Sequence, residues 1–292
     1  MDVVLQQVLR QGMLSLPDCI PLRRVSKQVS SKLDVSHAWP RDVHVTFREA
    51  DDAQAFRNWP MKQNRIHLSI HGSCRITDSF LTDLESFHIT GLDLHECPKI
   101  TDNVFIQLLL PSTITKLCID GCIEITDRGW SPLPILPITE LSMNNSYPDA
   151  FAVLPLKIGH SLTKLSLQGD LSILIHLEDK DLAPLSSFQS LTFLDLSGQT
   201  CLTGTGFTHL SNLPLHTLIL DTCWLLEDIG LSHLPSLHLH TLNLNNCFEI
   251  TDDGLTHLTS LPLTSLNMRS CISISQTGID TLAPLNLTTF IL

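Results

Sequence analysis

Cysteine, histidine and aspartate are the residues of this chain whose chemistry could be catalytic or metal-binding, so their spacing is considered first. The 292-residue sequence has nine cysteines and 14 histidines. A zinc site needs ligands at characteristic spacing, such as paired CxxC motifs or an HExxH helix, and neither motif occurs. Cys118 and Cys122 lie four residues apart, but no further ligands follow at matching spacing. The sequence therefore predicts no metal and no cofactor.

The same residue types recur at a nearly constant interval, which favours structural roles for them. His209, His233 and His257 are 24 residues apart, and would stack in adjacent coils. They could bind a metal or sense pH, but polar side chains facing water are the simpler interpretation. Aspartates also recur before short helical segments, and we expect them to be N-caps: Asp102, Asp127, Asp228 and Asp252. The recurring cysteines are Cys97, Cys122, Cys223, Cys247 and Cys271.

A repeated unit of 24 to 29 residues positions all of these side chains. The segment 239–258, LHTLNLNNCFEITDDGLTHL, recurs with modest change along the chain. Alternation around Leu242 and Leu244 predicts a short strand, and residues 254–258 predict a brief helical segment. One unit cannot enclose its own leucines, so the units must stack on one another. A thiol is small and nearly apolar, so a buried column of cysteines fits such a stack without redox chemistry.

This pattern resembles the cysteine-containing subtype of leucine-rich repeats over about residues 66–292. The five recurring cysteines fall at its Cys position, and Ile-Thr-Asp recurs at 76–78, 100–102, 125–127 and 250–252. The Cys position is taken by other residues in the middle units: Ser146, Asp170 and Gln199. The resemblance implies an α/β solenoid, a curved leucine-rich repeat horseshoe with a parallel sheet on its concave side and a small helical segment before it.

The chain is predicted to have three regions: 1–42 as a helical segment, 43–65 as an N-terminal capping coil and 66–292 as about ten repeats, the last incomplete. In the capping coil, residues 43–47 alternate like a strand and residues 51–59 read as a helix. Sequence alone leaves two roles open for the first region. It is either a docking segment for a partner or a cap over the first repeat.

The first region is similar to the second half of an F-box. The run from Asp18 to Lys27, DCIPLRRVSK, followed by Trp39, carries the resemblance, although the opening L-P-x-E of the family is absent and Pro21 interrupts the pattern. The resemblance implies docking on the Skp-type adaptor of a cullin-RING ubiquitin ligase. The candidate adaptor contacts are Leu5, Leu9, Leu16, Pro17, Ile20, Leu22 and Val25.

The concave face, meaning the side chains that flank the strand leucines, is the predicted target-binding surface. Strand residues alternate sides, so these positions can be read from the sequence. The candidates are Asp93, His95, Lys116, Asp120, Glu140, Lys164, Phe193, Asp195, Asp221, Asn243, Asn245 and Arg269. Such a surface would suit a polar or mildly basic protein segment. A second candidate is the large apolar residue after each Cys position: Ile123, Trp224, Phe248 and Ile272.

Charge and composition narrow the class of function. Residues 1–65 carry a net charge of +3 and residues 66–292 one of −15, which argues against a nucleic-acid partner. No apolar run is long enough for a membrane helix, and the first residues lack the basic segment of a secretory signal. A soluble cytoplasmic or nuclear protein is therefore expected. No nucleophile elbow, P-loop or dinucleotide fingerprint occurs, so an enzyme is not predicted. The favoured interpretation is the substrate-recognition subunit of a Skp-cullin-F-box ubiquitin ligase. The alternative is a repeat scaffold without that link.

Overall fold

The computed structural model describes residues 42–47, 65–70, 76–81, 87–103, 113–130, 137–145, 158–170 and 176–292. The chain divides into two compact units, Met1–Glu124 and Ile125–Leu292. The division falls inside the region predicted as repeats. Residues 1–41, with all seven candidate adaptor contacts, and the predicted helix at 51–59 lie outside the described residues.

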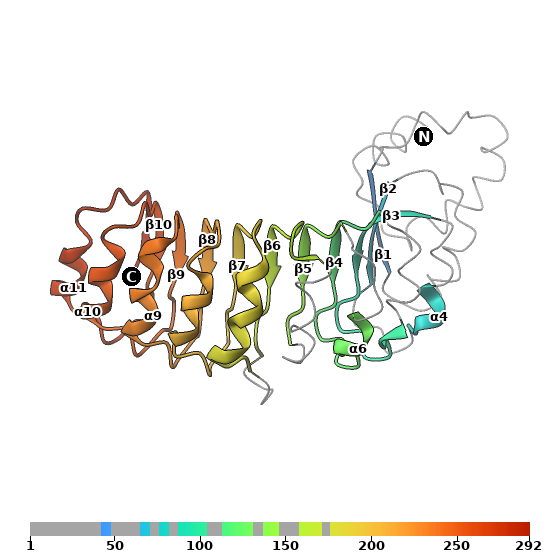
Figure 1. Ribbon diagram of the computed structural model, residues 1–292, viewed down its shortest axis with the longest axis horizontal. Coiled ribbons are helices and arrows are strands. Elements are labelled where there is room, and N and C mark those ends of the chain that lie inside the picture. Colours follow the sequence, from blue (N-terminus) through green and yellow to red (C-terminus); the bar gives the residue numbers. More distant parts are fainter. Residues whose placement is uncertain are drawn as a thin grey trace, which may run out of the picture. The chain divides into compact units, whose positions relative to one another are not determined.

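The unit Met1–Glu124 is built on parallel strands that pair in chain order (Figure 1). The predicted strand at 43–47 is confirmed as β1, Asp42–Phe47, which pairs with β2, Arg65–Ile70. The next strands are β3, His88–Asp93, and β4, Lys116–Cys118, and the short helix α4 spans Asp78–Leu81. Leu68 pairs with Leu92, which pairs with Leu117, so equivalent leucines of successive coils stack.

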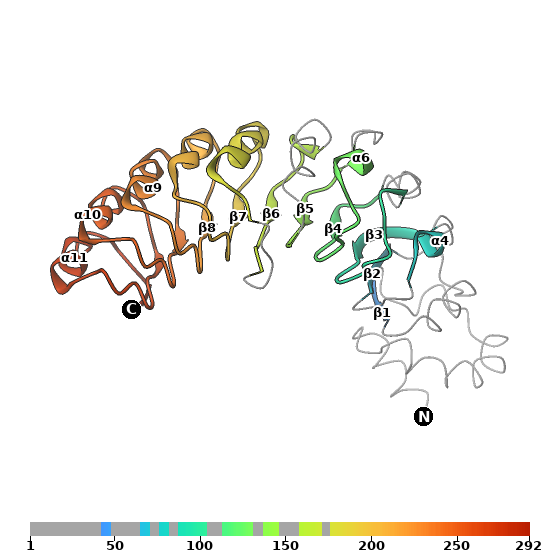
Figure 2. The ribbon, with the colours of Figure 1, turned by 90° about the horizontal axis from the view of Figure 1, so that it is seen from below.

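The unit Ile125–Leu292 repeats the same coil with shorter strands. Figure 2 shows its helices on the outer side of the strands. The strands are β5 Glu140–Ser142, β6 Lys164–Ser166, β7 Phe193–Asp195, β8 Thr217–Ile219, β9 Thr241–Asn243, β10 Ser265–Asn267 and β11 Thr289–Ile291. The helical segments are α6 Asp127–Trp130, η3 Asp179–Ser187, η4 Thr205–Leu210, α9 Asp228–Ser232, η5 Leu234–Ser236, α10 Asp252–Leu255, η6 Thr256–Leu258 and α11 Gln276–Thr281.

Leucine columns form the core between strands and helices, as the repeat predicts. Leu218, Leu242 and Leu266 are in register on neighbouring strands and are at most 1% exposed. Leu231 and Leu255 close the same space from α9 and α10 and are fully buried. Burying a leucine side chain contributes roughly 1.5–3 kcal/mol, so this stacking supplies most of the driving force for folding. None of the described helices has the length and hydropathy of a membrane-spanning segment.

The column of cysteines is buried and hydrogen-bonded between coils. The Sγ atoms of Cys122, Cys223 and Cys247 donate to the carbonyl oxygens of Leu94, Leu196 and Leu220, at 3.0, 3.3 and 3.1 Å. Each acceptor belongs to the preceding coil. Burial raises the pKa of Cys122 and of Cys223 to about 12, so both thiols stay protonated and keep these bonds. The geometry accounts for the Cys position without any reactivity.

Thiol labelling separates this structural role from a reactive one. We expect iodoacetamide to modify Cys201, which is exposed, in the native protein at pH 7.5. Cys223 and Cys247 should be modified only after denaturation, because their thiols are buried and protonated. Mass spectrometry of tryptic peptides measures each site. Native-state modification of Cys223 or Cys247 at the rate of Cys201 would contradict the structural role.

Two of the repeated aspartates, Asp228 and Asp252, join neighbouring coils, so the prediction that they cap their own helices is wrong for these two. Asp228 is the first residue of α9, and its carboxylate accepts hydrogen bonds from N and Oγ1 of Thr251 in the next coil, at 2.9 and 2.6 Å. Asp252 binds Ser275 in the same way, at 2.7 and 2.5 Å. Capping of α10 falls to Thr251, whose side chain accepts from the backbone N–H of Asp253.

Two glycines, Gly254 and Gly278, make room for the aspartate side chain of the preceding coil. A Cβ atom on Gly254 would overlap Oδ1 of Asp228, and one on Gly278 would overlap Oδ1 of Asp252. Neither glycine has a positive φ, so the requirement is steric. Asp179 forms the same kind of join: burial alone would raise its pKa, but hydrogen bonds from Gly206, Thr203 and Gly204 lower it below the usual value.

One coil carries an insertion, because its strand leucine Leu167 is 29 residues before the next one, Leu196, whereas most intervals are 24 residues. This longer coil explains one departure from the Cys pattern. Gln199 is buried at a Cys position, and its Nε2 donates to the carbonyl oxygen of Leu167, the acceptor that a thiol would use. Its Oε1 accepts the backbone N–H of Leu177 at 2.7 Å, in the coil that carries the insertion. A cysteine could not reach both groups. Gln199 therefore satisfies a buried backbone donor that the regular coils lack.

Candidate functional site

The predicted concave-face residues lie on one side of the strands, but they differ in exposure. Lys116, Lys164 and Arg269 are exposed, whereas Asp120 and Asp195 are buried, at 9% and 8% exposure. The others are half-buried: Asp93, His95, Glu140, Phe193, Asp221, Asn243 and Asn245. The exposed positions are therefore mostly cationic, and part of the acidic character lies beneath them.

In the unit Ile125–Leu292, a chain of polar side chains links three coils. Asn144 Oδ1 accepts from Ser166 Oγ and from the backbone of Gln168, at 2.8 and 2.7 Å. Gln168 Nε2 donates to Asp195 Oδ2 at 2.6 Å, and Ser197 donates to Asp195 Oδ1 through both N and Oγ. These three bonds hold Asp195 inside the surface. Asp195 therefore has a structural role in this surface, and its contact with a target stays a prediction.

Asp221 stays accessible and organises the polar residues of the next coil. Its Oδ1 accepts from Asn245 Nδ2 at 2.8 Å and from Thr222 Oγ1 at 2.8 Å.

An ion pair of 3.4 Å also joins two adjacent strands, between Glu140 on β5 and Lys164 on β6. A surface fixed in this way loses little side-chain entropy when a partner binds.

An apolar rim, defined here as Trp224, Leu225, Phe248 and Ile272, follows the Cys position in three successive coils. Each coil turns through a left-handed residue just before its cysteine: Thr222, Asn246 and Ser270 have φ values of 63°, 57° and 61°. This turn directs each cysteine inward and leaves the next residue outside. The Trp224 and Phe248 rings stack at 6.4 Å and 23°, and Trp224 and Ile272 are 40% and 78% exposed.

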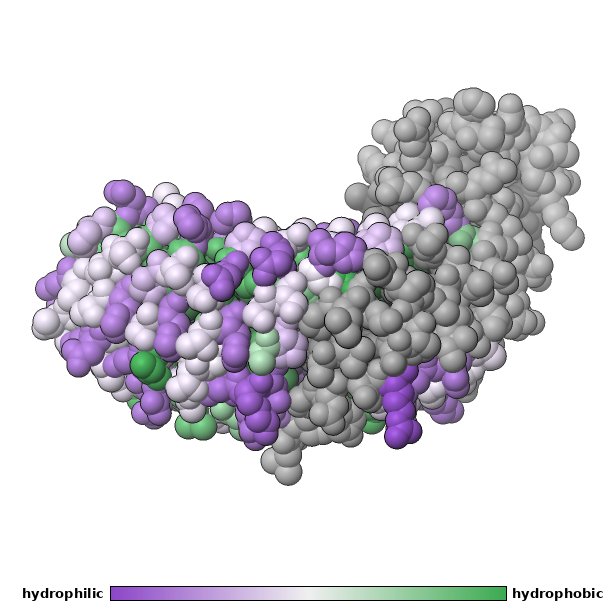
Figure 3. Space-filling view, in the orientation of Figure 1, coloured by the Kyte–Doolittle hydropathy of each residue, from purple (hydrophilic) through white to green (hydrophobic). Residues whose placement is uncertain are grey.

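The apolar rim belongs to a part of the chain in which nearly all Lys, Arg, Asp and Glu residues are acidic. Figure 3 shows the visible face of Ile125–Leu292 to be mainly hydrophilic, with apolar residues in small areas. From residue 221 to 292 the chain has one basic residue, Arg269. The acidic residues there are Asp221, Glu227, Asp228, Glu249, Asp252, Asp253 and Asp280. Aromatic rings in an acidic part of the chain favour an aliphatic and cationic partner, because cations are attracted both to aromatic faces and to carboxylates.

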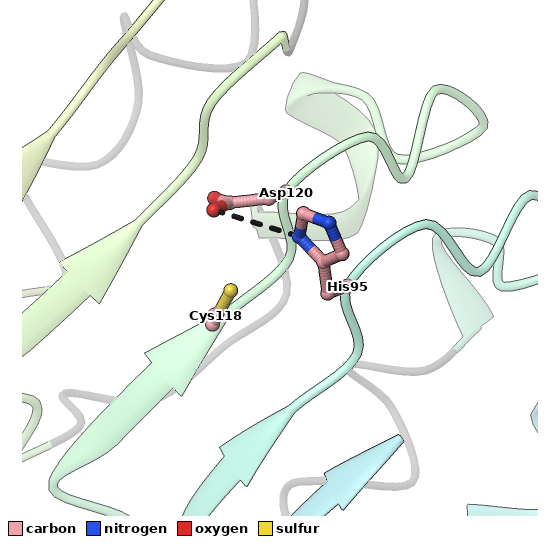
Figure 4. A group of neighbouring side chains, drawn as sticks. All are labelled: His95, Cys118 and Asp120. Carbon is pink, nitrogen blue, oxygen red and sulfur yellow. Dashed lines mark ion pairs between the residues drawn. The ribbon is translucent and has the colours of Figure 1, made fainter. Parts of the chain in front are cut away.

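In the unit Met1–Glu124, the structure brings together three side chains that the sequence did not group. His95, Cys118 and Asp120 each offer one ligand atom, and these atoms lie within 4.8 Å of one another. Figure 4 shows the three side chains converging from two adjacent coils. His95 follows β3, and the other two lie at and just beyond the end of β4. Sequence spacing gave a signal only in that all three occupy outward positions of consecutive units.

The recurring histidines show no such convergence. His209, His233 and His257 are half-buried, and none of them belongs to a group of three metal-ligand residues in the part of the chain that the structure describes. A histidine contact occurs elsewhere, between His216 and His240, whose rings are 5.3 Å apart in a T-shaped arrangement.

The geometry of the coils decides the fold. The strands are parallel and recur at intervals near 24 residues, their leucines form columns in register, and buried cysteines follow the strands. The chain folds as a leucine-rich repeat solenoid. This fold is typical of protein–protein interaction modules.

Comparison with known proteins agrees with the leucine-rich repeat fold. No protein family profile and no curated sequence matches the chain. A chain of the Rad7–Elc1 complex from yeast is similar over 98% of this chain and 80% of its own length, with 18% identity and a TM-score of 0.52. An internalin from Listeria monocytogenes is similar over 90% and 74%, with 20% identity and a TM-score of 0.46. The mouse RP105/MD-1 complex contains a chain similar over 86% and 51%, with 17% identity and a TM-score of 0.46.

Proposed function

We propose that this leucine-rich repeat protein is the substrate-recognition subunit of a Skp-cullin-F-box ubiquitin ligase. In this proposal, residues 1–42 dock on the Skp-type adaptor, and the repeats hold the target protein near the transferring enzyme. The chain acts by bringing the target close to the transferring enzyme, so it contributes binding and no catalytic group.

The observation that carries the binding role is the exposed apolar rim beside the polar concave face. Exposed apolar side chains that gather at one place can mark an interaction site, and tryptophan is enriched among the residues that dominate interface energies. The hydrogen bonds around Asp221 fix the adjoining polar positions. The acidic surroundings favour a target segment that carries lysine or arginine beside an aliphatic residue.

Support for the ligase link comes from the F-box-like run between Asp18 and Lys27. The positive net charge of residues 1–65 is consistent with an acidic adaptor. The yeast Rad7–Elc1 complex offers a parallel, in which a protein of similar fold assembles with a second protein.

Affinity purification of the tagged full-length chain, read by mass spectrometry, tests both halves of the proposal. We expect Skp and cullin subunits with the wild type, and their loss with a Leu22→Asp, Val25→Asp double variant that still folds. Proteins retained by that variant and lost with Trp224→Ala are targets. A folded wild-type chain that recovers neither Skp nor cullin would favour the alternative, a repeat scaffold without a ubiquitin-ligase link.

A further inference from the structure

Three potential metal ligands meet on the concave face of Met1–Glu124. His95 Nδ1 lies 3.9 Å from Asp120 Oδ2, and the Sγ atom of Cys118 completes a group within 4.8 Å (Figure 4). A tetrahedral zinc ion with nitrogen, sulfur and oxygen ligands places these atoms about 3.4–3.6 Å apart. Closing the group around an ion therefore takes side-chain movements of about 1 Å or less.

The backbone holds these ligands in place from both coils. Asp93 pairs with Cys118 in the parallel register of β3 and β4. Beyond the strands, the backbone N–H of Leu94 donates to the carbonyl of Cys118 at 2.9 Å, and that of Glu96 donates to the carbonyl of Asp120 at 2.8 Å. The turn that carries His95 is thus bonded to the turn that carries the other two ligands. Ion binding needs little ordering of the chain.

Each ring nitrogen of His95 has a carboxylate nearby. Its Nδ1 faces Asp120, while its Nε2 lies 3.8 Å from the carboxylate of Glu96. A carboxylate behind the second ring nitrogen orients a ligating imidazole and makes it a better donor. Asp93 adds a further restraint, because its carboxylate accepts from the backbone N–H of His95 at 3.1 Å and from Ser69 Oγ at 2.7 Å.

The electrostatics favour a cation. The Cys118 thiol lies beside the carboxylates of Asp120 and Asp93. A divalent cation beside the sulfur would offset the two carboxylates and displace the thiol proton. Among the cysteines, Cys118 differs from the buried column, because it is only half-buried and belongs to the concave face.

We propose that His95, Cys118 and Asp120 bind a zinc ion through nitrogen, sulfur and oxygen, with the fourth position open on the concave face. One imidazole, one thiolate and one carboxylate suit zinc better than magnesium or calcium, which prefer oxygen ligands alone. The open position takes water, or a side chain of a bound protein. This site stands independently of the ubiquitin-ligase proposal.

Cobalt(II) and zinc titrations of the full-length chain test the site. The variant used for titration carries Cys19→Ser, Cys74→Ser and Cys201→Ser, so that thiols outside the proposed site and outside the buried column do not bind the metal. We expect one equivalent of cobalt to give a thiolate-to-cobalt charge-transfer band and intense visible bands of a four-coordinate ion, with displacement by zinc. Calorimetry in buffers of different ionisation enthalpy should show release of the thiol proton.

Matched variants assign the ligands. Loss of an outer-sphere partner costs 10–100-fold in affinity, so loss of a ligand in Cys118→Ser or His95→Ala should cost about 100-fold or more. His95 is half-exposed, so its variant keeps the fold, which circular dichroism checks. Lys116→Ala on the same strand is the control and should keep the affinity within about 3-fold. A folded protein that gives no thiolate–cobalt band, or one that survives Cys118→Ser, would overturn the site.

Discussion

Gly254→Ala is expected to lower the free energy of unfolding by about 1–3 kcal/mol, although alanine is normally the better helix former by about 1 kcal/mol. Gly254 lies in α10, where its missing Cβ leaves room for the Asp228 carboxylate of the preceding coil. An added methyl group would displace that carboxylate from N and Oγ1 of Thr251. Chemical denaturation followed by circular dichroism measures the change.

A double-mutant cycle shows whether the aspartate is the cause. Asp228→Ala alone should also cost about 1–3 kcal/mol, because it removes two hydrogen bonds to a carboxylate. In that background Gly254→Ala should be neutral or stabilising by up to about 1 kcal/mol. Asp253→Ala, which changes an exposed neighbour, is the control. Additive effects of Asp228→Ala and Gly254→Ala would contradict the inter-coil join.

Trp224→Ala is expected to weaken target binding by about 30- to 1000-fold, the range of an interface hot spot worth roughly 2–4 kcal/mol. The Trp224 ring stacks on Phe248 in the next coil and is partly exposed to solvent. Ile229→Ala removes an equally exposed apolar side chain from α9 and serves as the control. Quantitative recovery of targets from cells, confirmed by titration with the purified target, gives the fold change.

Charge variants on the concave face should change the affinity for a basic target segment in opposite directions. Asp221→Lys should weaken binding, and Arg269→Glu should strengthen it, with both effects shrinking as salt is raised. Arg269 is the single Lys or Arg residue from 221 to 292, so its replacement by glutamate removes the one basic charge of this range and adds an acidic one. Equal losses from both variants would place the target elsewhere on the repeats.

The repeat period was sufficient to predict the coils and their core. Alternation around Leu242 and Leu244 and the spacing of the cysteines required a stack, and the structure confirms buried columns at those positions. The role of Asp228 was not predictable in the same way. Its partner lies 23 residues away in the next coil, and a single unit read by itself offers the nearby helix N–H groups instead.

The surface was predicted less well than the core, because outward positions of a repeat are not all equally accessible. Asp195 occupies an outward position, yet Gln168 and Ser197 hold it beneath the surface. The convergence of His95, Cys118 and Asp120 depends on side-chain directions in two coils. Motif searches assume ligands at short spacing along one segment, so they pass over ligands brought together by stacking.

The central proposal, a repeat protein attached to a ubiquitin ligase through its first region, is tested most directly with purified components. Calorimetric titration of the full-length chain with a recombinant Skp-type adaptor measures the affinity. We predict a 1:1 complex of micromolar affinity or better that is lost with Leu22→Asp and kept with Gln7→Asp, a charge change at a residue outside the candidate adaptor contacts. The melting temperature of the repeats should be the same in both variants. No complex with a folded wild-type chain, or one unaffected by Leu22→Asp, would contradict the proposal.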